Sequence, residues 1–179
     1  MKYKGLRLCL LITGLCIFSG CSEESVYTLS QDEVSIKVHD TQFDPLSYLL
    51  KDGEPLSESD RSKIKTGAKI DTSVVGKTVF TFPEYGLNLH VSIVDEEAPS
   101  LSVVGFQVKK DVVFTWNEET LGQLKAQISD NYDNGDLLKK TLHCDSVDTS
   151  KLGKQSITCY VEDSSGNKAS KTIEMEVVK

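Results

Sequence analysis

An internal repeat is the feature that most constrains the fold of this chain. The segment Asp71-Thr72-Ser73-Val74-Val75-Gly76-Lys77 recurs 77 positions later as Asp148-Thr149-Ser150-Lys151-Leu152-Gly153-Lys154. The agreement extends to the flanking apolar positions, because Phe80 falls opposite Ile157. A period of this length predicts two copies of one structural unit, each of about 75 residues.

Each copy has the pattern of short strands separated by turns. Three stretches alternate apolar and polar residues, as half-buried strands do: 34–38, 87–93 and 173–177. Val112, Phe114 and Trp116 are interpreted as one face of a further strand, and only 44–50 and 118–127 look briefly helical. Turn-forming residues separate the strands at 83–86 and 163–167. The pattern predicts an all-β fold of two tandem β-sandwiches, at residues 26–96 and 97–179.

The two copies meet at a short acidic joint. Residues 94–101 contain Pro99, which fixes the backbone, so we expect a stiff connection. The acidic run Asp95-Glu96-Glu97 is interpreted as a solvated joint; the alternative is that it shares an ion with a neighbouring loop.

The first residues have the pattern of an export signal. Lys2, Lys4 and Arg7 precede an apolar run that is too short to span a bilayer as a helix, which needs roughly 20 apolar residues. Ser19-Gly20-Cys21 then resembles the lipobox of bacterial lipoproteins. The resemblance implies a signal peptide at 1–20 and acylation of Cys21 with a diacylglyceryl or palmitate anchor. A short linker at 21–25 would follow. The expected location is the bacterial cell membrane, on the extracytoplasmic side. The alternative is an ordinary secretory signal with a chance cysteine.

Charge and cysteine content narrow the function. Residues 1–20 hold three basic and no acidic residues, so without them the formal charge of -7 becomes -10. An acidic chain is repelled by phosphate backbones, which argues against nucleic acid as a partner. Cys144 and Cys159 remain as an even pair in an exported chain, so a disulfide is predicted; two buried thiols are the alternative.

Three segments of the second copy are similar to the bacterial Ig-like domain family first noticed in a pesticidal crystal protein. They are the Asp- and Asn-rich loop at 128–137, residues 147–153, and residues 160–167 ahead of the last strand. The first copy matches less completely and is interpreted as a divergent copy. The resemblance implies an extracellular module used as a spacer, an adhesive unit or an accessory to an enzyme, and it implies no catalytic role.

The acidic loop of the second copy is the sharpest candidate site. Asp130, Asp133 and Asp136 surround Gly135, and closely spaced carboxylates can supply several of the oxygen ligands that Ca²⁺ requires. The spacing is not that of an EF-hand, and Asp and Asn also cap turns through their own backbone. Turn capping and a structural Ca²⁺ site therefore both remain open, and no other cofactor is expected.

The remaining candidate residues are more typical of structural roles than of catalysis or metal binding. His39, His90 and His143 have no zinc-like spacing, and no nucleophile elbow or phosphate-binding loop is present in the sequence. Trp116, Tyr132 and Phe106 are either a binding patch or core, and core is the more common role for aromatic residues.

The sequence thus predicts a non-enzymatic, lipid-anchored surface protein. Its Ig-like modules would bind an extracellular protein or glycan, or act as a structural spacer. Two alternatives remain: an accessory subunit of an exported enzyme or transporter complex, and an adhesin module stiffened by Ca²⁺.

Overall fold

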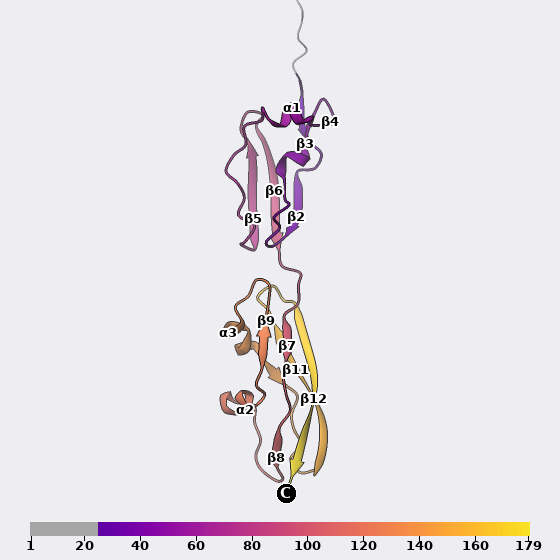
Figure 1. Ribbon diagram of the computed structural model, residues 1–179, viewed down its shortest axis with the longest axis vertical. Helices are drawn as coiled ribbons and strands as arrows, with labels where there is room; N and C mark the ends of the chain where they lie inside the picture. The colour runs from indigo at the N-terminus through magenta and orange to yellow at the C-terminus, as the bar shows by residue number, and fades with distance from the viewer. Residues whose placement is uncertain (1–24) are drawn as a thin grey trace, which may run out of the picture.

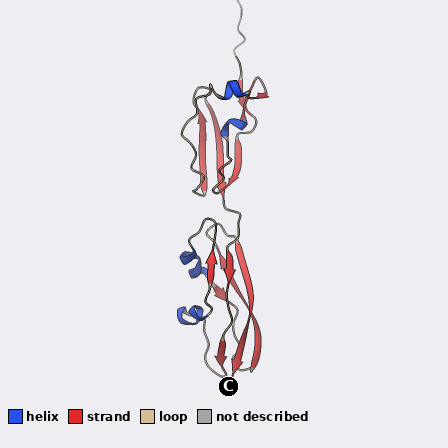
Figure 2. Ribbon diagram, in the orientation of Figure 1, coloured by secondary structure: helices blue, strands red, loops and turns tan. Residues whose placement is uncertain are grey.

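A computed structural model describes residues 25–179, which form an elongated body (Figure 1). Strands predominate and the few helices are short (Figure 2), so the prediction of an all-β chain is confirmed. Within residues 25–179, no helix combines the length and apolar character needed to cross a membrane. The predictions for the signal peptide and for Cys21 lie outside the described residues.

The N-terminal half contains six strands around one group of buried side chains. The strands are β1 (Tyr27–Leu29), β2 (Glu33–Lys37), β3 (Leu49–Lys51), β4 (Glu54–Pro55), β5 (Gly76–Phe82) and β6 (Leu87–Val94), with short helices η1 (Pro45–Tyr48) and α1 (Glu58–Arg61). They form two sheets, in the orders β1-β3-β4 and β2-β6-β5, and β2 runs parallel to β6. Leu49 comes from one sheet and Phe82 and Leu89 from the other, and all three are fully buried in the same core.

The C-terminal half has its own core. Its strands are β7 (Ser100–Ser102), β8 (Gln107–Lys109), β9 (Gln127–Ser129), β10 (His143–Cys144), β11 (Gly153–Glu162) and β12 (Lys168–Val178), with helices α2 (Glu118–Gln123), α3 (Gly135–Leu138) and η2 (Lys139–Thr141). The sheets have the orders β10-β11-β12-β8 and β7-β9. Leu124, Val161 and Met175 are buried in this second core.

The two halves share most of their strand pairing and differ at one edge strand, since β4 pairs with β3 whereas β10 pairs with β11. In the N-terminal half β6 lies between an antiparallel β5 and a parallel β2, and in the C-terminal half β12 lies between an antiparallel β11 and a parallel β8. The first short strand of each half pairs antiparallel with a later one, as β1 with β3 and β7 with β9. The repeat predicted from the sequence is therefore also a repeat of topology.

The repeated Asp-Thr-Ser segment makes the same turn twice. The Ser73 backbone N–H donates to Asp71 Oδ1 at 2.9 Å, and the Ser150 backbone N–H donates to Asp148 Oδ1 at 3.1 Å. Hydrogen bonds from Lys151 and from Ser150 lower the pKa of Asp148 to about 2, and hydrogen bonds from Ser73 also lower the pKa of Asp71. In both copies a charge-assisted turn directly precedes the long strand β5 or β11.

Three details of the sequence prediction were wrong. One is that helices were expected only at 44–50 and 118–127, whereas α1, α3 and η2 lie outside both segments. Residues 112–116 are not a strand: Phe114 and Trp116 pack against the core and Val113 is 97% exposed, but the backbone has no ladder partner. The alternating pattern reflects side-chain burial without strand pairing. The predicted helices 44–50 and 118–127 are shorter than expected, because residue 49 already begins β3 and residue 127 begins β9.

Candidate functional site at the junction of the halves

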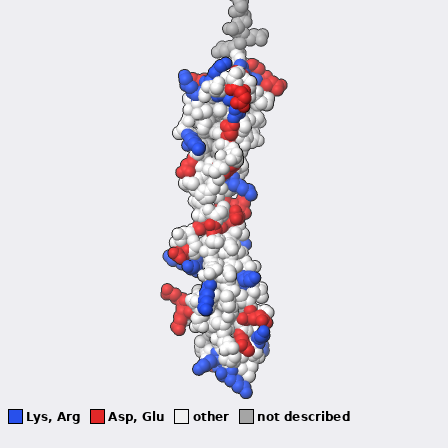
Figure 3. All heavy atoms as spheres, viewed as in Figure 1, with Lys and Arg blue, Asp and Glu red and all other residues white. Residues whose placement is uncertain are grey.

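Four carboxylates converge where the two halves meet. Asp95, Asp130, Asp133 and Asp163 each place one carboxylate oxygen within 4.8 Å of the others. Asp95 directly follows β6, the last strand of the N-terminal half, whereas the other three lie in the loops after β9 and β11. These strand ends face one another at the middle of the molecule, where acidic side chains gather on the visible surface (Figures 1 and 3). We call these four residues the junction cluster.

Two residues of the junction cluster, Asp130 and Asp163, cap turns in the loops that carry them. Asp130 Oδ2 accepts hydrogen bonds from the backbone N–H groups of Tyr132 at 3.0 Å and Asp133 at 2.9 Å. Asp163 Oδ1 accepts the backbone N–H groups of Ser165 at 2.9 Å and Asn167 at 2.8 Å. The turn capping expected for Asp and Asn is therefore present, and it fixes the direction of both loops.

Asp133 ties the two loops together. Its Oδ2 accepts hydrogen bonds from the backbone N–H of Ser164 at 2.9 Å and from the Ser164 hydroxyl at 2.8 Å. The loop after β9 and the loop after β11 are thus held side by side, and their carboxylates cannot easily separate.

Asp95 brings the N-terminal half into the cluster. Its side chain is buried, with the residue only 6% exposed. Its Oδ1 accepts a hydrogen bond from Asn131 Nδ2 at 3.0 Å, and its backbone oxygen accepts one from Asn167 Nδ2 at 3.1 Å. Both donors belong to the C-terminal half, so Asp95 is a direct polar link across the junction.

Two oxygens of the cluster are buried without a hydrogen bond. Neither Asp95 Oδ2 nor Asp130 Oδ1 has a partner among residues 25–179. Buried polar atoms are normally paired, because an unpaired one costs about 1–3 kcal/mol, and more when it is charged. The two orphan oxygens belong to different halves and to the same cluster.

The junction cluster gathers four acidic side chains without a paired basic side chain among the described residues. None of the ion pairs within the described part of the chain includes a junction-cluster carboxylate. Two ionised carboxylates within 4.8 Å repel by about 3–4 kcal/mol at an effective dielectric of about 20. The arrangement therefore favours any positively charged species that reaches all four oxygens.

Apolar and polar contacts around the cluster join the halves further. The ring of Tyr132, in the loop after β9, packs against the core of the N-terminal half. His39 Nε2 lies 3.2 Å from the backbone oxygen of Asn131. A surface hollow beside the cluster is lined by Val75, Val94, Asp95, Tyr132, Ser164 and Ser165.

The residues singled out in the acidic loop separate in the structure. Asp130 and Asp133 belong to the junction cluster, whereas the side chain of Asp136 is 86% exposed and pairs with Lys139 at 3.0 Å. Asp163 was not among the ligands expected from the sequence and was interpreted only as a turn residue. A usable signal was present: Asp95, Asp130 and Asp163 each follow the last residue of a strand directly.

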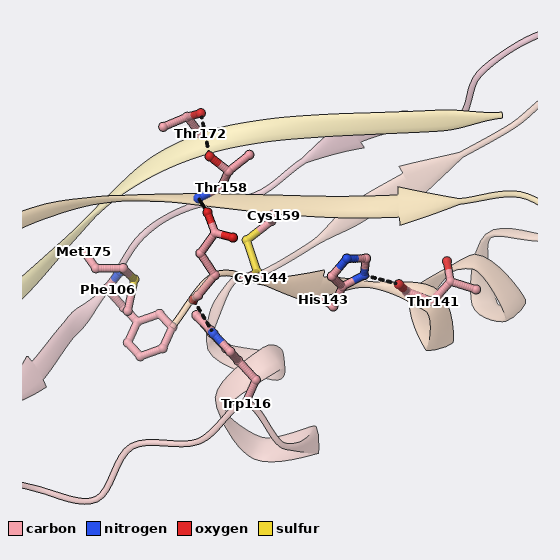
Figure 4. The surroundings of a disulfide bond; sticks show 10 residues. Phe106, Trp116, Thr141, His143, Cys144, Thr158, Cys159, Thr172 and Met175 are labelled. Carbon is pink, nitrogen blue, oxygen red and sulfur yellow. Dashed lines mark hydrogen bonds between the residues drawn. A yellow bond between two sulfur atoms is a disulfide. The ribbon is translucent and has the colours of Figure 1, made fainter. Parts of the chain in front are cut away.

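The second predicted covalent feature is a disulfide between Cys144 and Cys159, which lie opposite each other on β10 and β11 (Figure 4). Beside it, Trp116 Nε1 donates to the backbone oxygen of Asp145 at 2.8 Å. Phe106 packs edge-on against Trp116, with ring centroids 6.1 Å apart. Cys159 is fully buried, so the disulfide fastens the edge strand β10 to the core.

The three aromatic residues weighed as a patch do not form one. Phe106 and Trp116 pack against the core of the C-terminal half, whereas Tyr132 packs against the other core. The three histidines lie apart as well: His39 is at the junction, His90 is on β6 and His143 is on β10. Within residues 25–179, none of them belongs to a cluster of metal-ligating side chains.

No known family model matches this chain, and no curated protein matches it either. The resemblance to bacterial Ig-like domains therefore depends on the sequence segments named above.

Proposed function

We propose that this chain is a lipid-anchored extracytoplasmic protein made of two tandem Ig-like β-sandwich modules. Its role is non-catalytic: it holds a binding face, or a further partner, away from the membrane. The partner is an extracellular protein or a glycan. The export signal and the lipobox-like Ser19-Gly20-Cys21 support the anchor.

One observation carries the proposal. The two halves share most of their strand pairing and lie end to end in an elongated body (Figure 1). The first described strand, β1, lies at the end of the N-terminal half that is remote from the C-terminal half. A chain tethered upstream of β1 would therefore hold its C-terminal half outward.

The net charge supports a body that is held away from the membrane surface. Without residues 1–20 the formal charge is -10, so an anionic lipid surface repels the body of the protein. The acyl chain supplies attachment, and the charge keeps the modules off the surface.

Metabolic labelling with palmitate tests the anchor. Wild-type protein expressed in bacteria is expected to incorporate label, and the Cys21→Ala variant is expected to incorporate none. Cys144→Ala is the matched control, because it removes a cysteine of the folded body and should leave labelling unchanged. Unlabelled wild type, or equal labelling of Cys21→Ala, would contradict the anchor.

A further inference from the structure

We propose that the junction cluster is a Ca²⁺ site that joins the two halves of the chain. The ligands are carboxylate oxygens of Asp95, Asp130, Asp133 and Asp163. This set differs from the loop-only set of Asp130, Asp133 and Asp136 that the sequence suggests. The inference does not depend on the lipid anchor.

Two buried carboxylate oxygens of the junction cluster lack a hydrogen-bond partner among the described residues. Asp95 is more than nine-tenths buried, and its Oδ2 has no hydrogen-bond partner among the described residues. Asp130 is only partly buried as a residue, but its Oδ1 atom is buried and likewise has no hydrogen-bond partner among the described residues. Turn capping occupies the other oxygen of each carboxylate, so it does not explain these two. A bound cation gives both oxygens a partner at once.

The spacing of the four oxygens suits an ion of the size of Ca²⁺. Ca²⁺ binds oxygen at about 2.4 Å, so oxygens on opposite sides of one ion are about 4.8 Å apart. The four cluster oxygens all lie within 4.8 Å of one another. One ion placed among them lies about 2.9 Å or less from each oxygen, so small shifts of the side chains bring all four to the Ca–O distance.

The ligand chemistry also favours Ca²⁺. The set contains oxygen and neither nitrogen nor sulfur, which disfavours zinc and copper. Mg²⁺ retains several waters and is usually bound through one or two carboxylates, whereas Ca²⁺ accepts more carboxylates and an irregular shell of six to eight oxygens. Four carboxylates from three separate segments fit Ca²⁺ best.

The position of the ligands gives the ion a mechanical role. Asp95 belongs to the connector after β6, and the other three ligands belong to the C-terminal half. An ion held by all four removes their mutual repulsion and fixes the connector against both loops. Binding therefore stiffens the joint between the halves.

Calorimetric titration of chelator-treated protein with CaCl₂, at constant ionic strength, tests the site. We expect one Ca²⁺ per chain, with a dissociation constant at or below about 1 mM, the weak end of extracellular modules. The melting temperature should rise with Ca²⁺ and return with EDTA, and Mg²⁺ should give a clearly smaller rise. Absence of both heat and melting shift would overturn the proposal, and an equal effect of Mg²⁺ would overturn the assignment to Ca²⁺.

Variants locate the ion. Asp95→Asn should weaken binding at least about tenfold, because it removes one ligand charge. Asp136→Asn is the matched control: it removes an exposed charge from the same loop region outside the cluster and should change affinity less than about twofold. If circular dichroism shows that Asp95→Asn is unfolded, Asp133→Asn replaces it. Binding by these cluster variants at wild-type affinity would place the ion elsewhere and refute the inference.

Discussion

Reduction of the Cys144–Cys159 disulfide should destabilise the C-terminal half selectively. The two cysteines are 15 positions apart, and closing a loop of this size removes unfolded-state entropy worth about 3 kcal/mol. The bond also holds β10 against β11, where only two residue pairs form the ladder. We therefore expect the reduced form to lose about 3 kcal/mol of unfolding free energy in this half.

The chain contains a built-in probe for this measurement. Trp116 is the only tryptophan, and it packs against the core of the C-terminal half near the disulfide (Figure 4). Urea unfolding followed by Trp116 fluorescence therefore reports this half. With a denaturant slope of about 2 kcal/mol per M, reduction should lower the unfolding midpoint by about 1.5 M.

A double variant separates reduction from side effects of the reductant. Cys144→Ala/Cys159→Ala should unfold at a lower midpoint than the oxidised wild type, and reductant should not move that midpoint further. Identical midpoints for oxidised and reduced wild type would refute the reasoning. So would an equal shift of the double variant on addition of reductant.

Two further predictions concern single residues. A Cβ at Gly105 would lie 1.8 Å from the backbone oxygen of Glu174, so Gly105→Ala should destabilise the C-terminal half by about 3 kcal/mol or more. A Cβ at Gly122 would have nothing within 4 Å, so Gly122→Ala should be neutral or stabilising. Equal urea midpoints for the two variants would contradict this prediction. The pKa of Asp148 is lowered from 3.8 to about 2, so its ionised form stabilises the fold fully above pH 3.8 and this contribution is lost as the pH falls through about 2. The difference in melting temperature between wild type and Asp148→Asn should therefore narrow from about pH 6 to about pH 2, and a constant difference would show that the carboxylate charge does not matter.

The repeat was predictable because it depends on local chemistry. Asp71 and Asp148 cap turns within their own segments, and Gly76 and Gly153 adopt positive φ values of 149° and 109° where the next strand begins. Such information is contained in a few adjacent residues. The prediction of a strand at 112–116 was wrong for the opposite reason. A strand requires a backbone partner, and the alternating pattern of side chains does not specify one.

The junction cluster was only partly predictable. Asp130 and Asp133 share one loop, so their proximity is visible in the sequence. Asp95 and Asp163 are brought to them by strands that end at the same junction, which requires the topology of both halves. Asp136 looked equivalent to its neighbours, but Asn134 caps the helix α3 and Asp136 lies in its first turn, where it pairs with Lys139.

The most direct test is a crystal structure of the protein grown with Ca²⁺ and analysed by anomalous scattering. The account predicts one anomalous peak bonded to oxygens of Asp95, Asp130, Asp133 and Asp163, at about 2.3–2.6 Å from each. A structure in which the four carboxylates keep their positions and no peak lies among them would contradict the Ca²⁺ site. A peak bonded to other residues would also contradict it.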